Sequence, residues 1–250
     1  VYDGEPALGH AGQAGMRDAP RDTSPCSTSV PSEKASGLHG DRAYRRVRYN
    51  EPYISTVPLR PDASSAACTH CAAHLRAGPR PVVKAKKTAR IMIIGQAPGT
   101  KVHASGVPWD DASGNRLRDW LELDKETFYD ECQIAIVPMG FCFPGTNPKG
   151  GDFPPRPECA PLWHKKLREG LDSVELTLLV GQYAQKYYLG KQGKKTMTET
   201  VRCFTEYLPD YLPTPHPSWR TGIWQKKNTW FEEDIIPELR RRVHDLLVKG

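Results

Sequence analysis

The sequence has no long hydrophobic run and no secretory leader pattern. None of its apolar stretches approaches the roughly 18 residues that a membrane-spanning helix needs. The first residues lack the charged-then-apolar pattern of a signal peptide, and no segment of the chain is repeated. These absences argue against a membrane protein, a secreted protein and a repeat protein. We therefore expect an intracellular protein that does not act at a membrane.

The even set of cysteines that marks a disulfide framework is also missing. The chain has 7 cysteines, and an odd count without a signal peptide indicates thiols with another use. Cys68 and Cys71 form a Cys-x-x-Cys pair, whereas Cys142 and Cys159 have 16 residues between them. Four such thiolates together suit zinc or an iron–sulfur cluster, and the spacing alone leaves both open.

Acidic residues are absent between Asp62 and Asp110, although the net charge of the whole chain is only +6. An all-basic stretch of this kind is typical of a surface that faces phosphates. A solvated basic loop is the alternative, and proximity to the candidate site loop favours contact with a polyanion. The cations concerned are Arg76, Arg80, Lys84, Lys86, Lys87, Arg90 and Lys101.

Residues 1–60 show almost no apolar periodicity, and we expect a flexible N-terminal extension there. Residues 61–250 form the expected folded domain, in which buried-strand patterns alternate with helical ones. This alternation predicts an α/β fold: a three-layer sandwich with a central, mostly parallel four-stranded sheet and helices on both faces. The expected strands are 90–94, 133–137, 174–180 and 204–208, and the expected helices are 116–123, 161–169, 182–189 and 230–248.

The first strand leads into the turn Gly95-Gln96-Ala97-Pro98-Gly99. A buried parallel strand that ends in Gly and Pro delivers its loop to the carboxyl edge of the sheet, where α/β proteins bind ligands. An ordinary strand-to-helix turn without chemistry is the alternative that this motif alone leaves open.

The four-cysteine spacing resembles that of the iron–sulfur uracil-DNA glycosylases of families 4 and 5. Gly95–Gly99 resembles their first motif, which is Gly-Glu-Ala-Pro-Gly in family 4, and His216-Pro217-Ser218 resembles their second motif. The resemblance implies a monomeric DNA repair enzyme of the prokaryotic cytoplasm that hydrolyses the N-glycosidic bond of uracil, or of other deaminated bases, in DNA. It also implies a [4Fe–4S] cluster on Cys68, Cys71, Cys142 and Cys159, with zinc as the less favoured occupant.

The resemblance assigns roles around the base that is flipped out of the duplex. His216 corresponds to the motif histidine, a neutral donor to the uracil O2. Trp109 in Gly106-Val107-Pro108-Trp109 corresponds to a stacking Phe, with a core tryptophan as the alternative. Gly95 to Gly99 and Ser218 would complete the substrate pocket. Trp219 and Arg220 lie where the family inserts its wedge, and Lys101, Lys226 and Lys227 would meet phosphates.

Two departures from the family pattern concern the chemistry. Gln96 replaces the family 4 Glu and Ala97 follows it, so the first motif has no carboxylate. We expect Asp111 to orient the water or stabilise the sugar cation, and Asp110 is the alternate for this role. The alternative without a function is that these aspartates are only solvated surface residues. Pro138 stands where family 4 has a base-reading Asn, which leaves Gln96 or the backbone of residues 139–141 to read the base.

Two other functions fit part of the pattern. One is a non-catalytic iron–sulfur member of the same fold that binds DNA lesions without excising them, consistent with the missing motif carboxylate and Pro138. The other is a zinc-bound α/β hydrolase that acts on a different substrate.

Overall fold

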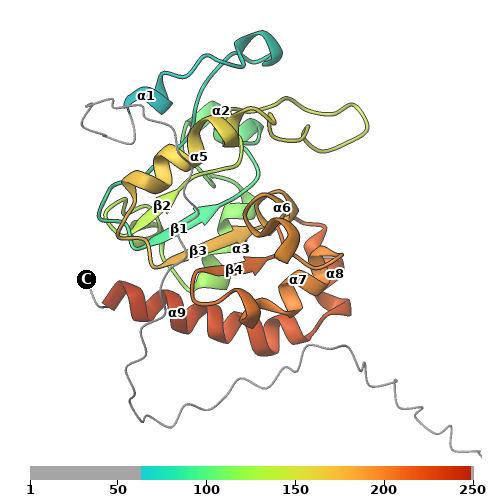
Figure 1. Ribbon diagram of the computed structural model, residues 1–250. Coiled ribbons are helices and arrows are strands. Elements are labelled where there is room, and N and C mark those ends of the chain that lie inside the picture. The colour runs from blue at the N-terminus through green and yellow to red at the C-terminus, as the bar shows by residue number, and fades with distance from the viewer. Residues whose placement is uncertain (1–62, 249–250) are drawn as a thin grey trace, which may run out of the picture.

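The computed structural model describes residues 63–248 (Figure 1). The expected extension, residues 1–60, lies outside this part of the chain. A four-stranded parallel sheet with the order β2-β1-β3-β4 forms the centre of the domain. Its strands are β1 (Ile91–Ile94), β2 (Ile134–Ile136), β3 (Leu176–Val180) and β4 (Tyr211–Thr214). The predicted α/β class and the first three predicted strands are confirmed.

The fourth strand was predicted at the wrong place. Residues 204–208 mostly form a 3-10 turn, η3 (Phe204–Tyr207), whose buried Phe204 and Tyr207 gave the segment its strand character. The actual strand, β4, contains Pro213, which cannot donate a ladder hydrogen bond. This proline is tolerated because β4 is an edge strand that pairs only with β3 within the described sheet.

Each face of the sheet is covered by its own hydrophobic core, as a three-layer arrangement requires. Ile91 and Ile93 of β1 belong to the core shared with α3 (Ala112–Leu121) and α9 (Ile236–Val248). Met92 and Ile94 belong to the opposite core, shared with α5 (Cys159–Gly170) and α6 (Gln182–Leu189). Figure 1 shows α3 and α9 on one side of the sheet and α5 on the other.

The remaining described elements are short. They are α1 (Ala63–Ala66), η1 (Ala72–His74), α2 (Thr100–Ser105), α4 (Lys125–Phe128), η2 (Gly190–Gln192), α7 (Met197–Arg202), α8 (Thr221–Lys227) and the π-helical turn η4 (Phe231–Ile235). No helix among the described residues is long and apolar enough to cross a membrane.

Helix α3 begins earlier than its apolar stripe predicts. The stripe of Leu117 and Leu121 gave a helix from residue 116, whereas α3 starts at Ala112. Its N-cap is Asp111, whose Oδ1 accepts a hydrogen bond of 2.8 Å from the N–H of Gly114. A capping carboxylate satisfies one of the unpaired N–H groups of the first turn, so the helix can begin at a polar sequence.

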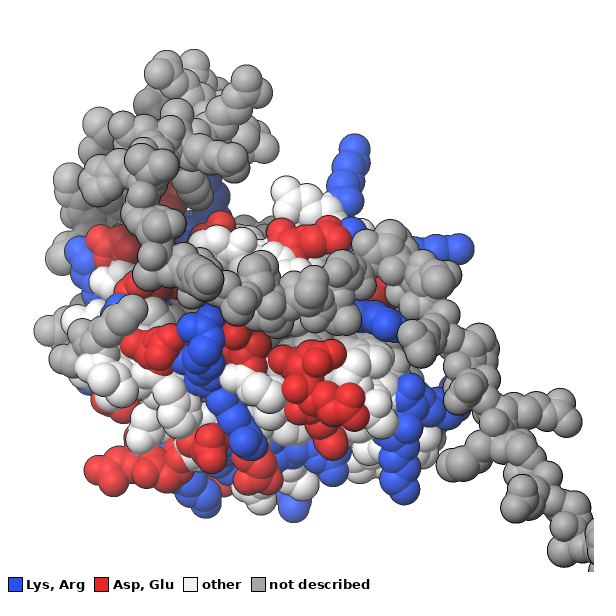
Figure 2. Space-filling view, turned by 90° about the horizontal axis from the view of Figure 1, so that it is seen from below, with Lys and Arg blue, Asp and Glu red and all other residues white. Residues whose placement is uncertain are grey.

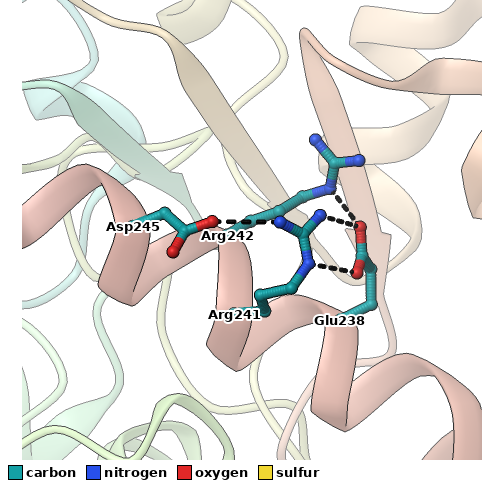
Figure 3. Close-up of polar contacts among 4 residues, drawn as sticks. All are labelled: Glu238, Arg241, Arg242 and Asp245. Carbon is teal, nitrogen blue, oxygen red and sulfur yellow. Dashed lines mark hydrogen bonds and ion pairs between the residues drawn. The ribbon is translucent and has the colours of Figure 1, made fainter. Parts of the chain in front are cut away.

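The face of the domain seen from below in Figure 1 carries both signs of charge (Figure 2). On α9, Glu238 accepts hydrogen bonds from Arg241 and Arg242, and Arg241 also pairs with Asp245 (Figure 3). The Glu238 side chain is only 10% exposed. Its bonds to Arg241, and the charge of Arg242, hold the pKa of this carboxyl below its usual value.

Replacing Glu238 with Gln should lower the free energy of unfolding by about 1 kcal/mol at pH 7, after allowance for solvent screening of the exposed Arg241. A carboxyl whose pKa is depressed on folding stabilises the fold above its ordinary pKa, about 4.3. That stabilisation is lost as the pH falls through the depressed value. The difference between the variant and the parent should therefore shrink steadily below about pH 4. Urea unfolding of both proteins at several pH values measures this difference in the free energy of unfolding.

Asp245→Asn is the matched control, since Asp245 pairs only with the half-exposed Arg241 among the described contacts. We expect this variant to change stability by less than about 0.5 kcal/mol. If Glu238→Gln and Asp245→Asn lowered the free energy of unfolding equally at pH 7, the larger stabilising contribution predicted for Glu238 would be contradicted.

Candidate functional site

A cavity of about 580 Å³ opens at the carboxyl edge of the sheet, a size usual for small-molecule sites. The loops that follow β1, β2 and β4 all contribute to its wall. Most of the site residues expected from the sequence line this one cavity: Gly95, Gln96, Ala97, Pro98, Gly99, Trp109, Asp111, His216, Ser218, Trp219 and Arg220. Segments more than 100 residues apart in the chain are thus brought together.

The first-motif loop is held by the backbone that follows β2. The N–H groups of Met139 and Gly140 donate to the carbonyls of Gly95 and Gln96, at 2.9 and 3.0 Å. The N–H of Phe141 donates to the Sγ of Cys159 at 3.3 Å. These three N–H groups are therefore occupied within the protein, which does not favour their use as donors to a base. The half-buried side chain of Gln96 and the backbone carbonyls of residues 139–141 remain among the base readers expected from the sequence.

Trp109 has a backbone conformation that bulky residues rarely adopt, with φ of +58°. Its indole lies against Gly95, where an added Cβ would come within 2.6 Å of the ring. Its carbonyl lies so close to Gly114 that a Cβ there would be 1.7 Å from the oxygen. Two glycines thus make room for the side chain and the carbonyl of this residue. A strained residue maintained by its surroundings in a cavity wall is a feature of functional sites.

His216 follows β4 and lies beside Trp109, with ring centroids 5.5 Å apart and planes inclined by 33°. Burial lowers the pKa of His216, and the negative charge of Asp111 opposes this only in part, so the ring is neutral at pH 7. The carbonyl of His216 accepts from the N–H of Ser218 at 2.8 Å and from the hydroxyl of Thr221. Because Gly181 has no side chain, the His216 side chain can lie close to the end of β3: a Cβ on Gly181 would be 3.2 Å from the Cβ of His216.

Two carboxylates line the cavity, and the sequence indicated only one of them. Asp111 is present as expected, although it also caps α3. The alternate, Asp110, is exposed and is not part of the wall. Asp152, from the loop between Cys142 and Cys159, is the carboxylate that sequence reasoning missed. Burial raises the pKa of Asp152, a hydrogen bond with Thr146 opposes that rise, and the charge of Asp111 adds to it.

The rim of the cavity carries the residues expected to enter or touch DNA. The Trp219 side chain is 73% exposed, and the Arg220 guanidinium lies 5.2 Å from its ring centroid. The backbone just before Trp219 is anchored, because the Arg116 guanidinium donates a hydrogen bond to the carbonyl of Ser218. Lys101 and Lys226 are exposed but do not line the cavity.

Several Lys and Arg side chains between Asp62 and Asp110, the stretch without acidic residues, bond to other residues of the chain. Lys84 pairs with Glu131 at 3.2 Å, and Arg90 donates to Glu175 and to the carbonyl of Leu246. Arg90 also precedes β1, at the opposite edge of the sheet from the cavity. These contacts do not support the expected phosphate-binding role of Lys84 and Arg90.

The four cysteines predicted as a set surround a second, smaller cavity. Cys68 and Cys71 flank the segment before η1, Cys142 follows β2, and Cys159 begins α5. Among residues 63–248, no three or more His, Cys, Asp or Glu side chains converge in a way that suits a single metal ion. The four thiols instead line the wall of one cavity.

Each of three thiols has an identified N–H donor that fits a thiolate. The Trp163 indole donates to Cys68 at 3.3 Å, the Phe141 backbone donates to Cys159, and the Arg156 guanidinium bonds to Cys71. Burial raises the pKa of Cys159 to about 12, so an isolated thiol there holds its proton. Bound metal deprotonates such thiols, and N–H donors stabilise the resulting sulfur charge. Four thiols with N–H donors beside them are the chemical type of ligand that an iron–sulfur centre uses, although their positions do not form a site for a single metal ion.

A recessed cavity at the carboxyl edge of a parallel sheet, with an aromatic face, a neutral histidine and two carboxylates, is the kind of site at which α/β proteins bind and transform ligands. The family model described as the uracil DNA glycosylase superfamily matches residues 82–240, and the chain belongs to this superfamily. Membership implies a DNA glycosylase-like function with DNA as the substrate. The matched segment contains the whole sheet but neither Cys68 nor Cys71.

Proposed function

We propose that the protein excises uracil, or another deaminated base, from DNA by hydrolysing the bond between the base and the deoxyribose. The observation that supports this most is the meeting of Trp109, His216 and the Gly95–Gly99 loop in one cavity. An aromatic face and a neutral hydrogen-bond donor are what a flipped base needs once it has left the stack.

Extrusion of the base costs a few kcal/mol of stacking and pairing, and contacts with the protein offset this cost. In the proposed complex the base stacks on Trp109. The exposed Trp219 enters the gap in the duplex, where an apolar or planar side chain replaces the lost stacking. Arg220 beside it, and Lys101 and Lys226 further out, neutralise phosphates.

Cleavage leaves negative charge on the base and positive charge on the sugar. His216, kept neutral by burial, donates to the carbonyl oxygen where the negative charge develops. Asp111 has one oxygen bound to the Gly114 N–H, and its charge stabilises the sugar cation.

Gln96 is proposed to read the base edge. Deamination replaces an exocyclic amino group with a carbonyl next to a ring N–H, so the deaminated bases share an acceptor beside a donor. A side-chain amide has one donor group and one acceptor, and it complements that edge. Pro138 supplies no side-chain hydrogen bond, which favours acceptance of several deaminated bases over strict uracil specificity.

We further propose that Cys68, Cys71, Cys142 and Cys159 hold a structural [4Fe–4S] cluster. Four thiols from separate segments around one cavity, with N–H donors beside them, support this assignment. A bound cluster would join the segment before η1 to the loop after β2 and to α5. Zinc is the alternative occupant.

Release of free base from oligonucleotides that contain uracil, hypoxanthine or xanthine tests the proposed function. We expect release from at least the uracil substrate, with a cytosine duplex as the control. Tight and selective binding of the damaged duplexes without any release would instead identify a lesion-binding protein.

A further inference from the structure

The loop between Cys142 and Cys159 forms a hairpin that places a carboxylate at the base cavity. Thr146 and Asp152 form an antiparallel bridge, and the N–H of Asn147 donates to the carbonyl of Gly151 at 2.8 Å. The N–H of Phe153 donates to the carbonyl of Gly145 at 2.9 Å. These bonds fix the backbone on both sides of Asp152, although the segment has no helix or strand of its own.

The Asp152 carboxylate lies against the first-motif loop. An added Cβ on Gly99 would come within 3.3 Å of Asp152 Oδ2, so the glycine leaves room for the carboxylate. Asp152 therefore occupies space next to the very loop whose own carboxylate is missing. Asp111 lies close enough for its charge to act on Asp152, so two carboxylates from distant segments share the cavity.

The two carboxylates differ in the hydrogen-bond partners that they have within the protein. Asp111 caps α3 through the Gly114 N–H, a backbone bond that ties it to the helix. Asp152 has the Thr146 hydroxyl as a hydrogen-bond partner, lines the cavity and is exposed to solvent there. A carboxylate with a raised pKa takes up a proton more readily, and burial raises the pKa of Asp152.

We propose that Asp152 is the catalytic carboxylate that accepts a proton from the attacking water, a role that rests on the proposed glycosylase function. A lone pair of the water oxygen forms the new bond to the anomeric carbon of the sugar. The electrons of the glycosidic bond leave with the base, whose carbonyl is bound by His216. The proton that the water loses passes to Asp152 and then to solvent.

The test compares single-turnover excision by Asp152→Asn, Asp152→Ala and Asp245→Asn with that of the unchanged protein. Asn keeps the shape of Asp and can still accept from Thr146, but it cannot take a proton. We expect Asp152→Asn to slow excision by about 100-fold, with DNA binding changed less than about 3-fold. Asp152→Ala should be similarly slow and should recover part of its rate when formate is added. Asp245→Asn, on α9 and outside the cavity wall, should excise normally.

An Asp152→Asn protein that excises within about 3-fold of the parent would overturn the proposal and leave the glycosylase function standing. A slow Asp152→Ala protein that formate does not restore, with weakened DNA binding, would also overturn it, since it would assign Asp152 to loop structure. If the unchanged protein released none of the deaminated bases, both the proposed function and this role would fail.

Discussion

Replacing His216 with Ala should reduce single-turnover excision by about 100- to 1000-fold, because one preorganised donor to a developing oxyanion stabilises the transition state by roughly 3–4 kcal/mol. The donor acts on charge that appears only as the bond breaks. Affinity for the uncleaved substrate should therefore change little. The rate with saturating enzyme and the Kd of a duplex with a non-cleavable uracil analogue measure the two effects.

His216→Asn provides a second variant for the same question. Its amide keeps an N–H donor, so its rate should lie between those of the parent and the Ala variant. Because burial lowers the pKa of His216 below its ordinary value, the imidazole is neutral at pH 7, and its titration should not alter the rate from pH 7 to pH 8. Equal rates for the parent and His216→Ala would contradict the proposed role.

Loss of the proposed cysteine-bound cluster should have the second largest effect. Protein prepared without oxygen should contain about four irons per chain and show the broad visible absorbance of a [4Fe–4S] centre. Cys159→Ser should lose that absorbance and unfold with a stability at least about 3 kcal/mol lower, because metal binding is coupled to folding. Iron analysis, absorbance and thermal unfolding provide the measurements.

Cys132→Ser is the matched control, since Cys132 is exposed and lies outside the four-cysteine cavity. It should keep both the iron and the stability of the parent. One equivalent of zinc in place of iron, with the same loss of stability in Cys159→Ser, would instead assign a structural zinc site.

The parts of the site that depend on local sequence could be predicted, whereas those that depend on packing could not. Gly95–Gly99 was placed correctly because a buried strand followed by Gly and Pro carries its own signal. Asp152 was missed because its position depends on a hairpin in a Pro- and Gly-rich loop that has no periodicity. The occupied N–H groups of residues 139–141 were also beyond sequence reasoning, since their acceptors lie elsewhere in the chain.

Strand β4 is a second feature that depends on packing and could not be predicted from local sequence. Pro213 lowers the strand propensity of β4, so a prediction from propensity misses this edge strand. Buried aromatic residues raise the strand propensity of η3, which is not a strand. Only the parallel pairing of residues 211–214 with residues 177–180 of β3 defines the true strand. Tertiary packing overrides local preference most easily at an edge strand, where one side has no ladder to complete.

The contact between Arg90 and Leu246 has a practical consequence. Arg90 precedes β1, and its guanidinium donates to the Leu246 carbonyl at 2.6 Å, near the end of α9. The last described turn of the chain is thereby attached to the amino edge of the sheet, while the base cavity opens at the carboxyl edge. A fluorophore, affinity tag or surface linker joined after Val248 would leave from the far side of the sheet. Protein immobilised in this way would present its cavity to incoming DNA.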